Sequence, residues 1–444
     1  MAGLPPIESS AVWHPYTAVP PPGPRVLITR AEGAYVYDAQ GNRYFDATSS
    51  WWSQIHGHCH PALVEALSKQ AATLDQILLS PHTHPAAQDF AEALLRKMGA
   101  PYSKVFWSDD GSTAVEAALK MALQYWQRRG EPERRAFLSM ERAYHGDTLG
   151  AIAVGHIDEF HRVFKNVLET HKSTAPYCYR CPLGLQYPRC EIACLNRARE
   201  VFEKHASTLA ACIVEPLMLG AGGLITYPVE YLDGLMELCR QHRVPMIFDE
   251  VATGFGRTGT MFAFEQTRGR PDIVCLSKGL TSGMMALGAT VTTQEIFQEF
   301  CGGESVKFFH GHTFTGNGLA CAVGLRSLEL FDSNQVLCRN QDLVQEMAAQ
   351  TARFEALPIV GQVRHLGMIW AMELVQDRVT REPFNPPNSR GWAICNRAWE
   401  EGVWLRPMGS QLYVMPPYCT TREQLRDCFE VLYRNTQKES EAHG

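Results

Sequence analysis

The stretch Pro245-Met-Ile-Phe-Asp-Glu250 decides the fold, because a short and wholly apolar run ends abruptly in two carboxylates. We expect this run to be a buried strand, and four further apolar runs share its length and character: 104–107, 136–139, 211–214 and 273–276. Helical periodicity fills the segments between them. Buried strands that alternate with helices are typical of a mostly parallel sheet covered by helices on both faces. The sequence therefore predicts an α/β fold.

Changes in the pattern of apolar and polar residues predict that the chain of 444 residues has three parts. Residues 1–59 form an N-terminal arm and a hairpin, with its turn at Gly41-Asn42, that join the small domain. Residues 60–330 form the large domain, which holds the sheet. Residues 331–444 form a smaller C-terminal α/β domain, with strands expected at 368–372 and 411–415.

Composition and charge exclude several classes of partner. The net charge is −6, and 20% charged and 45% hydrophobic residues are ordinary globular values. No basic patch indicates a nucleic-acid or membrane-surface site. No apolar stretch approaches the roughly 18 residues of a membrane span, and the N-terminal residues lack the features of a secretory signal. We expect a cytoplasmic protein that acts on small molecules.

The first strand end carries a candidate phosphate site, since ligands of open parallel sheets bind beyond the carboxyl ends of the strands. Run 104–107 leads into Asp109-Asp-Gly-Ser-Thr113 and then an amphipathic helix. Gly111 and Ser112 lie at the start of this helix, where free amide groups and the helix dipole favour a phosphate. An ordinary helix cap explains the same residues equally well.

Two further strand ends supply a carboxylate and an amine. Asp249 ends a buried strand, where a carboxylate needs a cationic partner such as a protonated pyridine nitrogen. Lys278 follows run 273–276, where partial burial exposes a nucleophilic amine. Either residue alone is more often an ordinary surface group. Together with the candidate phosphate site, in this order, they indicate a pyridoxal-phosphate (PLP) site.

A glycine pattern nearby offers a competing interpretation. Gly254-Phe-Gly-Arg-Thr-Gly259 matches the dinucleotide fingerprint and would make the protein an NAD-binding oxidoreductase. That fingerprint must open a helix, and the residues after Gly259 show no convincing helical pattern. We therefore disfavour a nicotinamide site and keep the NAD-binding oxidoreductase as the alternative from another class of protein.

The stretch 247–259 followed by Ser277-Lys278-Gly279 resembles the signature of the class III PLP-dependent aminotransferases. Shorter matches occur at 144–148, 215–216, 220–223 and 315–317, so the resemblance covers nearly the whole chain. It implies PLP fold type I, PLP as the cofactor, a ping-pong amino transfer between small-molecule substrates, and a homodimer with shared active sites.

The same resemblance implies roles for individual residues. Lys278 forms a Schiff base with the cofactor and then carries a proton, Asp249 pairs with the pyridinium, and Tyr144 stacks on its ring. Thr313 reaches the phosphate from the other subunit. The residues assigned to the cofactor are Gly111, Ser112, Tyr144, Asp249, Lys278 and Thr313.

Within the class, the segments 13–17, 49–52, 309–314, 405–409 and 412–418 are similar to members that convert 8-amino-7-oxononanoate to 7,8-diaminononanoate in biotin biosynthesis. The resemblance assigns Arg406 to the substrate carboxylate, a task suited to its planar fork. The residues assigned to the substrates are Tyr16, Trp51, Trp52, Asp147, Gly311, His312, Arg406 and Tyr413.

Alternatives remain open at this point. His312 resembles members that use lysine as amino donor, whereas Tyr16 and the tryptophan pair point to S-adenosylmethionine. Another class III aminotransferase, acting on a diamine or an ω-amino acid, is the nearest rival. A catalytically idle regulator that binds PLP or a metal is a third.

Four of the fourteen cysteines are clustered, at Cys178, Cys181, Cys190 and Cys194. A disulfide framework is not expected in a cytosolic protein. The spacing offers four thiolates for Zn²⁺ or an iron–sulfur cluster. Transamination needs no metal and the four side chains can simply pack a loop, so we predict no metal and retain the cluster as a candidate.

Overall fold

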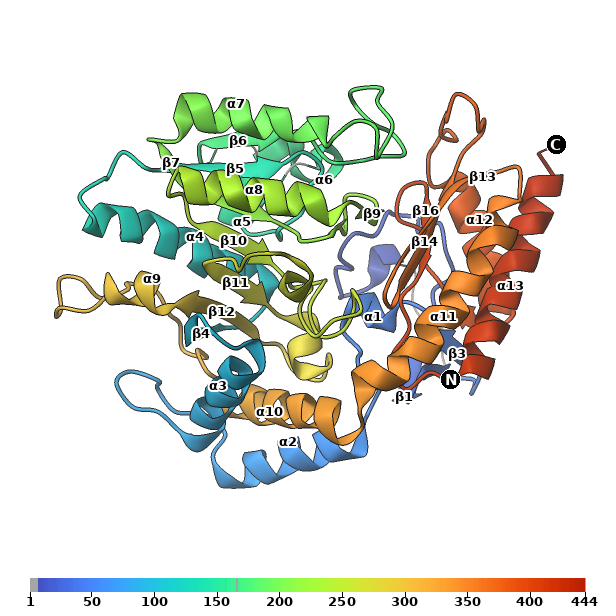
Figure 1. Cartoon of the computed structure of the whole chain (residues 1–444). Helices are drawn as coiled ribbons and strands as arrows, with labels where there is room; N and C mark the ends of the chain where they lie inside the picture. The colour runs from blue at the N-terminus through green and yellow to red at the C-terminus, as the bar shows by residue number, and fades with distance from the viewer. Residues whose placement is uncertain (1–6, 156, 165–166, 444) are drawn as a thin grey trace. The chain divides into compact units, whose positions relative to one another are not determined.

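The computed structural model describes residues 7–155, 157–164 and 167–443, so the first six residues of the predicted arm lie outside it (Figure 1). The described chain divides into two compact units. The first contains the described residues up to His60, then Asp342–His365, and the chain from Ile369 onward. The second contains Pro61–Gln341 with Leu366–Met368. Each unit is described by itself below.

The second unit is built on a seven-stranded sheet with the order β4-β12-β11-β10-β7-β5-β6. Its strands are β4 (Tyr102–Ser108), β5 (Ala136–Met140), β6 (Thr170–Ser173), β7 (Leu209–Val214), β10 (Met246–Asp249), β11 (Ile273–Leu276) and β12 (Gly288–Thr293). Strand β12 pairs antiparallel with β11 and β4, whereas the other four pairs are parallel. All five predicted runs lie in this sheet, which confirms the prediction of a mostly parallel α/β fold.

Two strands of the sheet were not predicted. Strand β6 reads Thr-His-Lys-Ser and lacks an apolar run, because it lies at the edge of the sheet, where part of its surface stays accessible. Strand β12 reads Gly-Ala-Thr-Val-Thr-Thr and is buried throughout. Its threonines are accommodated by hydrogen bonds: Thr290 Oγ1 donates to the carbonyl of Ala114 at 2.7 Å.

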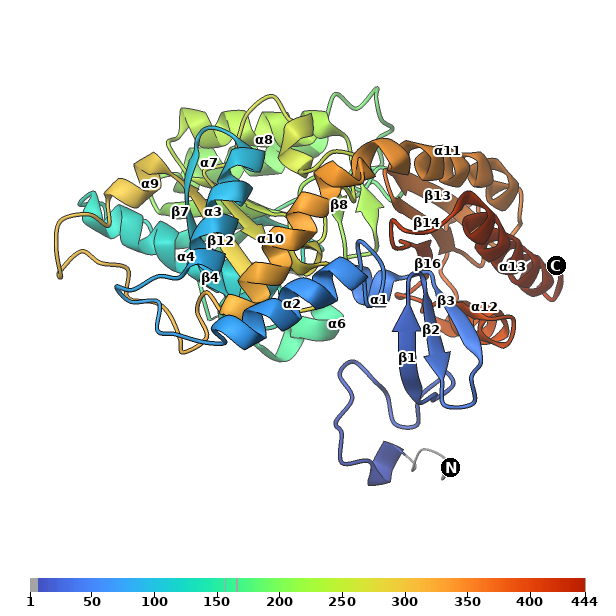
Figure 2. The same cartoon turned by 90° about the horizontal axis from the view of Figure 1, so that it is seen from below.

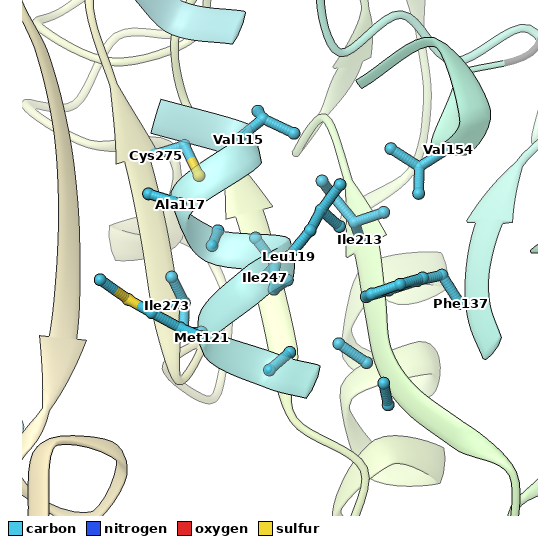
Figure 3. Close-up of a cluster of buried hydrophobic side chains, with 14 of the residues drawn as sticks. Val115, Ala117, Leu119, Met121, Phe137, Val154, Ile213, Ile247, Ile273 and Cys275 are labelled. Atoms are coloured by element: carbon cyan, nitrogen blue, oxygen red, sulfur yellow. The ribbon is translucent and has the colours of Figure 1, made fainter. Parts of the chain in front are cut away.

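Helix α4 (Gly111–Arg128) packs on this sheet through the predicted apolar stripe. Its buried members are Val115, Ala118, Leu119, Ala122 and Trp126. They belong to one cluster with side chains of β5, β7, β10 and β11. Figure 3 shows Val115 and Leu119 of this stripe beside Ile213 and Ile247. Each large aliphatic side chain buried in this way stabilises the fold by about 1.5–3 kcal/mol. The amphipathic helix predicted after the first strand is confirmed.

The remaining elements of the second unit surround the sheet. They are α2 (Pro61–Thr73), α3 (Pro85–Met98), α5 (Leu149–Val154), α6 (Asp158–His161), α7 (Asn196–His205), α8 (Val229–Gln241), α9 (Gln294–Gln298), α10 (Gly318–Ser333) and the short pair β8 (Met218–Leu219) and β9 (Ile225–Thr226). Helix α10 packs against both α2 and α3, and the three helices lie side by side in Figures 1 and 2. Helix α11 (Val336–Glu355) begins in the second unit and continues into the first unit from Asp342.

The first unit contains two small sheets. One has the order β1-β2-β3-β15, formed by β1 (Ile28–Glu32), β2 (Tyr35–Asp38), β3 (Arg43–Asp46) and β15 (Val403–Trp404). The other comprises β13 (Val360–Leu366), β14 (Ile369–Leu374) and β16 (Gln411–Val414). The predicted hairpin is the antiparallel pair β2–β3, with Gly41 at a φ of 88°. The two predicted C-terminal strands are β14 and β16.

Three further helical elements belong to the first unit: α1 (Ser49–Trp52), α12 (Ser389–Glu400) and α13 (Arg422–Glu441). Helices α12 and α13 pack against each other. Among the helices of the described chain, none has a stretch long and apolar enough to cross a bilayer.

Candidate active site

The carboxyl ends of neighbouring strands bring the first set of candidate residues to one edge of the sheet. Strand β10 ends at Asp249, which is in register with Cys275 of β11, three residues before Lys278. Strand β7, parallel to β10, ends one residue before Glu215. Strand β5, parallel to β7, is followed by the loop that carries Tyr144. Parallel pairing therefore assembles these residues at one edge.

Asp249 is buried and held by two hydrogen bonds. Its Oδ2 lies 2.8 Å from Nδ1 of His145, and its Oδ1 accepts from the backbone amide of Val251 at 3.1 Å. Only 5% of the aspartate is exposed, and the His145 ring is also buried. The carboxylate thus has one orientation, fixed by groups on either side. The sequence analysis did not assign His145, because its partner lies 104 positions away.

Lys278 is partly buried at the start of a short 3-10 helix, with its backbone at a φ of 45°. A left-handed conformation costs a residue with a side chain of order 1–3 kcal/mol, and such strain clusters at functional sites. Burial lowers the pKa of Lys278, while the carboxylates of Asp249 and Glu215 act in the opposite direction. Burial therefore favours the neutral, nucleophilic amine.

Glu215 is a buried carboxyl that the sequence analysis quoted in a motif but gave no role. Burial, reinforced by the charge of Asp249, raises the pKa of Glu215 to about 8. Its Oε1 accepts from the backbone amide of Tyr144 at 3.0 Å, and its Oε2 accepts from Gly220 at 2.9 Å. Glu215 therefore holds the backbone of the Tyr144 loop in place.

The side chain of Tyr144 is positioned by a second set of contacts. Its hydroxyl donates to Oδ2 of Asp147 at 2.8 Å. Its ring stacks on the buried ring of His161, with centroids 5.8 Å apart and an interplanar angle of 18°. His161 Nε2 also lies 3.9 Å from Oδ1 of Asp147. The structure thus brings Tyr144 and Asp147 together and adds His161, which no sequence motif indicated.

The start of α4 combines a helix cap with a candidate anion site. Asp110 and Thr113 form a capping box, in which Oδ1 of Asp110 accepts from the Thr113 amide at 2.8 Å. Gly111 and Ser112 lie inside this cap, and Ser112 Oγ accepts from the amide of Asp147 at 3.2 Å. A Cβ on Gly146, at a φ of 121°, would lie 2.2 Å from Ser112 Oγ, so this close approach requires glycine.

The segment with Gly311, His312 and Thr313 is exposed. His312 Nδ1 lies 3.6 Å from Oδ2 of Asp109, which precedes α4. The carbonyl of Thr313 accepts from Nε2 of Gln76 at 2.6 Å. In the single chain, the first contact places the segment next to the residues that lead into α4, and the second places it next to the loop after α2.

In the first unit, three of the predicted substrate residues lie together. The Trp51 ring contacts the Tyr16 ring edge-on, with centroids 5.7 Å apart. The guanidinium carbon of Arg406 lies 5.2 Å from the centre of the Trp51 ring, and Nη2 of Arg406 donates to the carbonyl of Tyr16 at 2.8 Å. We call Tyr16, Trp51 and Arg406 the aromatic–arginine cluster. Its position at the surface suits recognition of a carboxylate attached to an apolar chain.

The tryptophan pair is presented by an unusual turn. In α1, Ser49, Ser50, Trp51 and Trp52 all have φ between 45° and 76°, so the turn is left-handed. Left-handed helical geometry costs roughly 1–2 kcal/mol per residue. Side chains hold the turn: Ser49 Oγ donates to the carbonyl of Met415 at 2.6 Å, and Ser50 Oγ donates to Oδ2 of Asp46 at 3.0 Å.

The turn points its two tryptophans into different surroundings. Trp51 is 45% exposed, whereas Trp52 is buried and contacts the buried Tyr413 ring edge-on at 6.2 Å. Burial raises the pKa of Tyr413 to about 12, so its phenol stays protonated at neutral pH. Trp52 and Tyr413 therefore form a supporting layer, and Trp51 is the member of the pair that remains accessible.

The four clustered cysteines line one small cavity in the loop between β6 and α7. Burial, with a further contribution from the neighbouring thiols, raises the pKa of Cys194 to about 11 and also raises that of Cys178. Within the described residues, no group of three or more His, Cys, Asp or Glu side chains is arranged to hold a metal ion. We therefore derive no metal chemistry from this loop.

Comparison with known proteins identifies the family. A model of the class III aminotransferase family matches residues 17–435. The chain belongs to the class III aminotransferases. The adenosylmethionine-8-amino-7-oxononanoate aminotransferase of Geobacter sulfurreducens is 44% identical over 93% of both chains. The crystal structure of the enzyme of that name from Methanocaldococcus jannaschii has a TM-score of 0.90 at 35% identity, covering 96% of this chain and 97% of its own.

A further solved structure is an amine transaminase from an uncultivated Pseudomonas species in its PLP-bound form. It has a TM-score of 0.92 at 32% identity and covers 97% of this chain and 99% of its own. Pyridoxal phosphate is the cofactor of this class III aminotransferase. The glycine-rich stretch 254–259 is followed by a 3-10 helix, η4 (Ala263–Gln266), and so lacks the helix that a dinucleotide site requires.

The residues at the strand ends fit this cofactor. When bound, PLP acts as an electron sink for the carbon that carries the amino group. Asp249 is a buried carboxylate of fixed orientation, suited to a pyridinium nitrogen, and Lys278 is an amine whose pKa is lowered by burial. Gly111 and Ser112 begin an 18-residue helix whose N-terminus favours a phosphate. The individual roles remain predictions.

Proposed function

We propose that this aminotransferase converts 8-amino-7-oxononanoate to 7,8-diaminononanoate, a step of biotin biosynthesis. The observation that carries the proposal is the aromatic–arginine cluster. Its Arg406 guanidinium offers paired donors for the carboxylate of the oxononanoate, next to the exposed face of Trp51 for the apolar chain. The similarity to the Geobacter sulfurreducens enzyme supports the same reaction.

In this proposal each residue has a limited task. Arg406 binds the substrate carboxylate, and Trp51 and Tyr16 pack on the methylene chain. Lys278 carries the proton at its Nζ between the substrate carbon and the cofactor, which its lowered pKa favours at neutral pH. Asp249 would pair with the cofactor nitrogen, in the orientation that His145 fixes. Tyr144 would stack on the cofactor ring, and Asp147 would line the substrate pocket.

The proposal includes a homodimer with shared active sites, in which Thr313 reaches the phosphate of the other subunit. Two large apolar side chains that flank this residue support it, since Phe309 is 63% and Phe314 56% exposed in the single chain. Exposed aromatic side chains next to a functional loop are typical of surfaces that are covered in an assembly. His312 would then contact the amino donor, S-adenosylmethionine or lysine.

The nearest rival is an amine or ω-amino acid aminotransferase, because an amine transaminase shares the fold over nearly its whole length. Simple amine substrates have no carboxylate for Arg406 to bind. An amine substrate therefore leaves the aromatic–arginine cluster without a task, which favours the oxononanoate reaction over a simple amine. An ω-amino acid has a carboxylate that Arg406 can bind, so the substrate test below separates that rival.

The test is the absorption spectrum of the purified holoenzyme before and after addition of 7,8-diaminononanoate. We expect the Schiff-base band to be replaced by the band of the pyridoxamine form, because the diamine runs the half-reaction backwards. 2,3-Diaminooctane, which differs only in lacking the carboxylate, serves as the control and should react far more slowly. A Schiff-base band that is unchanged by diaminononanoate would exclude the proposed substrate, and so would an equal change with both diamines. Either result leaves the protein in the aminotransferase class.

Once that half-reaction is established, the amino donor can be identified from the other half-reaction, in which the donor gives its amino group to the cofactor. S-adenosylmethionine and lysine are added separately to the PLP form. The compound that produces the pyridoxamine form is the donor.

A further inference from the structure

Helix α5 begins directly after the loop that carries Tyr144 and Asp147, and it packs on α4 (Figure 1). Its N-cap residue is Thr148, whose side chain makes no capping hydrogen bond. The first amides of a helix have no partner within that helix, so they need a side chain or water as acceptor. The start of α5 therefore depends on a group from outside its own segment.

Glu116 of α4 supplies an acceptor for this helix start. Its Oε1 accepts from the backbone amide of Gly150 at 2.8 Å and from that of Ala151 at 3.3 Å. These are the second and third residues of α5, the positions that a side-chain cap usually serves. A carboxylate on one helix thus caps another helix, 34 positions along the chain.

The glycine at position 150 permits this contact. A Cβ on Gly150 would lie 2.3 Å from Oε2 and 2.7 Å from Oε1 of Glu116. Atoms this close overlap, so a larger residue would displace the carboxylate. Glycine weakens a helix relative to alanine. Its presence in α5 is therefore explained by the approach of Glu116 and not by the needs of the helix itself.

Glu116 makes the second of two contacts from α4 to this segment. One turn earlier on α4, Ser112 Oγ accepts from the amide of Asp147 at 3.2 Å. Residues four apart lie on the same face of a helix. One face of α4 therefore holds the segment at two points, first at Asp147 and then at Gly150 and Ala151.

The two contacts link the parts of the site that are assigned to the two ends of the cofactor. Helix α4 begins at the candidate phosphate site, Gly111 and Ser112. At its other end the Tyr144 loop is held by the sheet, because Glu215 accepts from the amide of Tyr144 at 3.0 Å. The loop is thus held between a strand end and α4, and the Glu116 contact helps to set its distance from the phosphate site.

We propose that Glu116 is a positioning residue for the cofactor. By capping α5, it fixes the Tyr144 loop relative to the phosphate site at the start of α4, and so fixes the ring of Tyr144 against the cofactor ring. The inference rests on the cofactor roles proposed for Ser112 and Tyr144, and it is independent of which substrate the enzyme uses. Glu116 itself touches neither the cofactor nor the substrate.

The experiment measures two properties: the Kd of the apoenzyme for PLP, and the visible circular dichroism of the PLP-saturated enzyme. The dichroism reports the asymmetric surroundings of the bound chromophore, so a loss of stability alone does not change it at saturation. Glu116→Ala should raise the Kd about 10-fold, the effect of losing one helix cap, and should reduce the dichroism of the Schiff-base band. Wild-type values of both properties would overturn the proposal.

The conservative variant Glu116→Gln distinguishes the cap from the charge. It keeps a side-chain oxygen at the same reach as acceptor for the two amides, so its Kd for PLP should stay within about 3-fold of wild type. Its dichroism should match that of wild type. Losses as large as those of Glu116→Ala would contradict a capping role.

Gly150→Ala reaches the same contact from the other helix. The added methyl group should displace the Glu116 carboxylate and weaken PLP binding as Glu116→Ala does, even though alanine favours the helix. The two losses should not add in the double variant, because each substitution removes the same contact. Additive losses, or wild-type binding in Gly150→Ala, would overturn the proposal.

The matched control is Thr293→Ala. Thr293 caps α9, another short helix, by accepting from the amide of Ile296 at 3.4 Å. It ends β12, which runs antiparallel to β11, and so lies at the edge of the sheet opposite to Asp249. Thr293→Ala should lower thermal stability and leave both PLP measurements at wild-type values. Changes equal to those of Glu116→Ala would show a general effect of cap loss and overturn the proposal.

Tyr144→Leu separates this inference from the role on which it rests. If Tyr144→Leu alters the dichroism and Glu116→Ala does not, the positioning role of Glu116 fails alone. If neither substitution alters it, the stacking role of Tyr144 fails as well. Neither measurement involves a substrate, so the proposed reaction is not affected by the outcome.

Discussion

The strand-end cluster of the second unit and the aromatic–arginine cluster of the first unit are built in opposite ways. Asp249 is 5% exposed and held from two sides, whereas Tyr16 and Trp51 are 43% and 45% exposed and contact each other edge-on. The first arrangement fixes charges in a low-dielectric setting, where small displacements matter. The second presents adaptable apolar surface. We infer that the cofactor side sets the chemistry and the aromatic side sets the substrate, so that the two can be altered separately.

The strongest test of this separation is Lys278→Ala. We expect turnover to disappear, because in the proposed function Lys278 supplies both the Schiff base and the proton carrier. The measurement combines the amino-transfer rate with the absorption spectrum, which should lose the Schiff-base band. Lys204→Ala, an exposed lysine on α7, is the control and should behave as wild type. Residual turnover at the wild-type rate would remove Lys278 from the chemistry.

Asp249→Asn should have the next largest effect. The substitution removes a buried charge next to His145 and Lys278, and the loss of such a charge interaction costs a factor of about 30 or more. We expect this loss in kcat, with the KM for the oxononanoate little changed. A variant that changes KM alone would show that the strand-end cluster also selects the substrate.

Arg406→Met probes the other side of the comparison. Loss of a charge-assisted hydrogen bond should raise the KM for 8-amino-7-oxononanoate about 10- to 100-fold and leave kcat close to wild type. Arg426→Met is the control for the loss of a surface guanidinium in the same unit. An unchanged KM would contradict the role of the aromatic–arginine cluster.

His161 offers a smaller test of the support behind Tyr144. His161→Ala removes the ring that stacks on Tyr144 and should lower kcat/KM about 2- to 10-fold, the size of an aromatic pair. His161→Phe keeps a ring in place and should recover most of the loss. Equal losses in both variants would show that the charge near Asp147, rather than the stack, is what matters.

The smallest effect concerns stability and pH. Burial raises the pKa of Glu250 to about 8 from the ordinary 4.5, so between these values the folded protein holds a proton that the unfolded chain lacks. The stability from this group is therefore complete below pH 4.5 and is lost as the pH rises through about 8. Urea unfolding at pH 6 and pH 8.5 should show a smaller difference for Glu250→Gln than for wild type, whatever its overall stability. An unchanged difference would assign the pH dependence to other groups such as Glu215.

The sequence predicted those parts of the molecule that are encoded locally. Apolar runs located five strands of the large sheet, and periodicity located α4, because burial leaves a direct signature in neighbouring residues. Strand β6 was not predicted because an edge strand is not wholly buried and can be polar. Two contacts were not predicted because they depend on how distant segments meet. They are the pairing of His145 with Asp249 and the support of Tyr144 by His161. The left-handed turn of Ser49–Trp52 has no local signal, since none of its residues is glycine.

That turn has a consequence for synthesis of the protein. The hydroxyl of Ser49 is anchored on the carbonyl of Met415, 366 positions later, and the amide of Met415 donates to the carbonyl of Ala47 at 2.7 Å. A chain still on the ribosome that has not been extended past Met415 holds the turn only through the local bond from Ser50 to Asp46. The long-range anchor that fixes the turn carrying Trp51 therefore forms only near the end of translation.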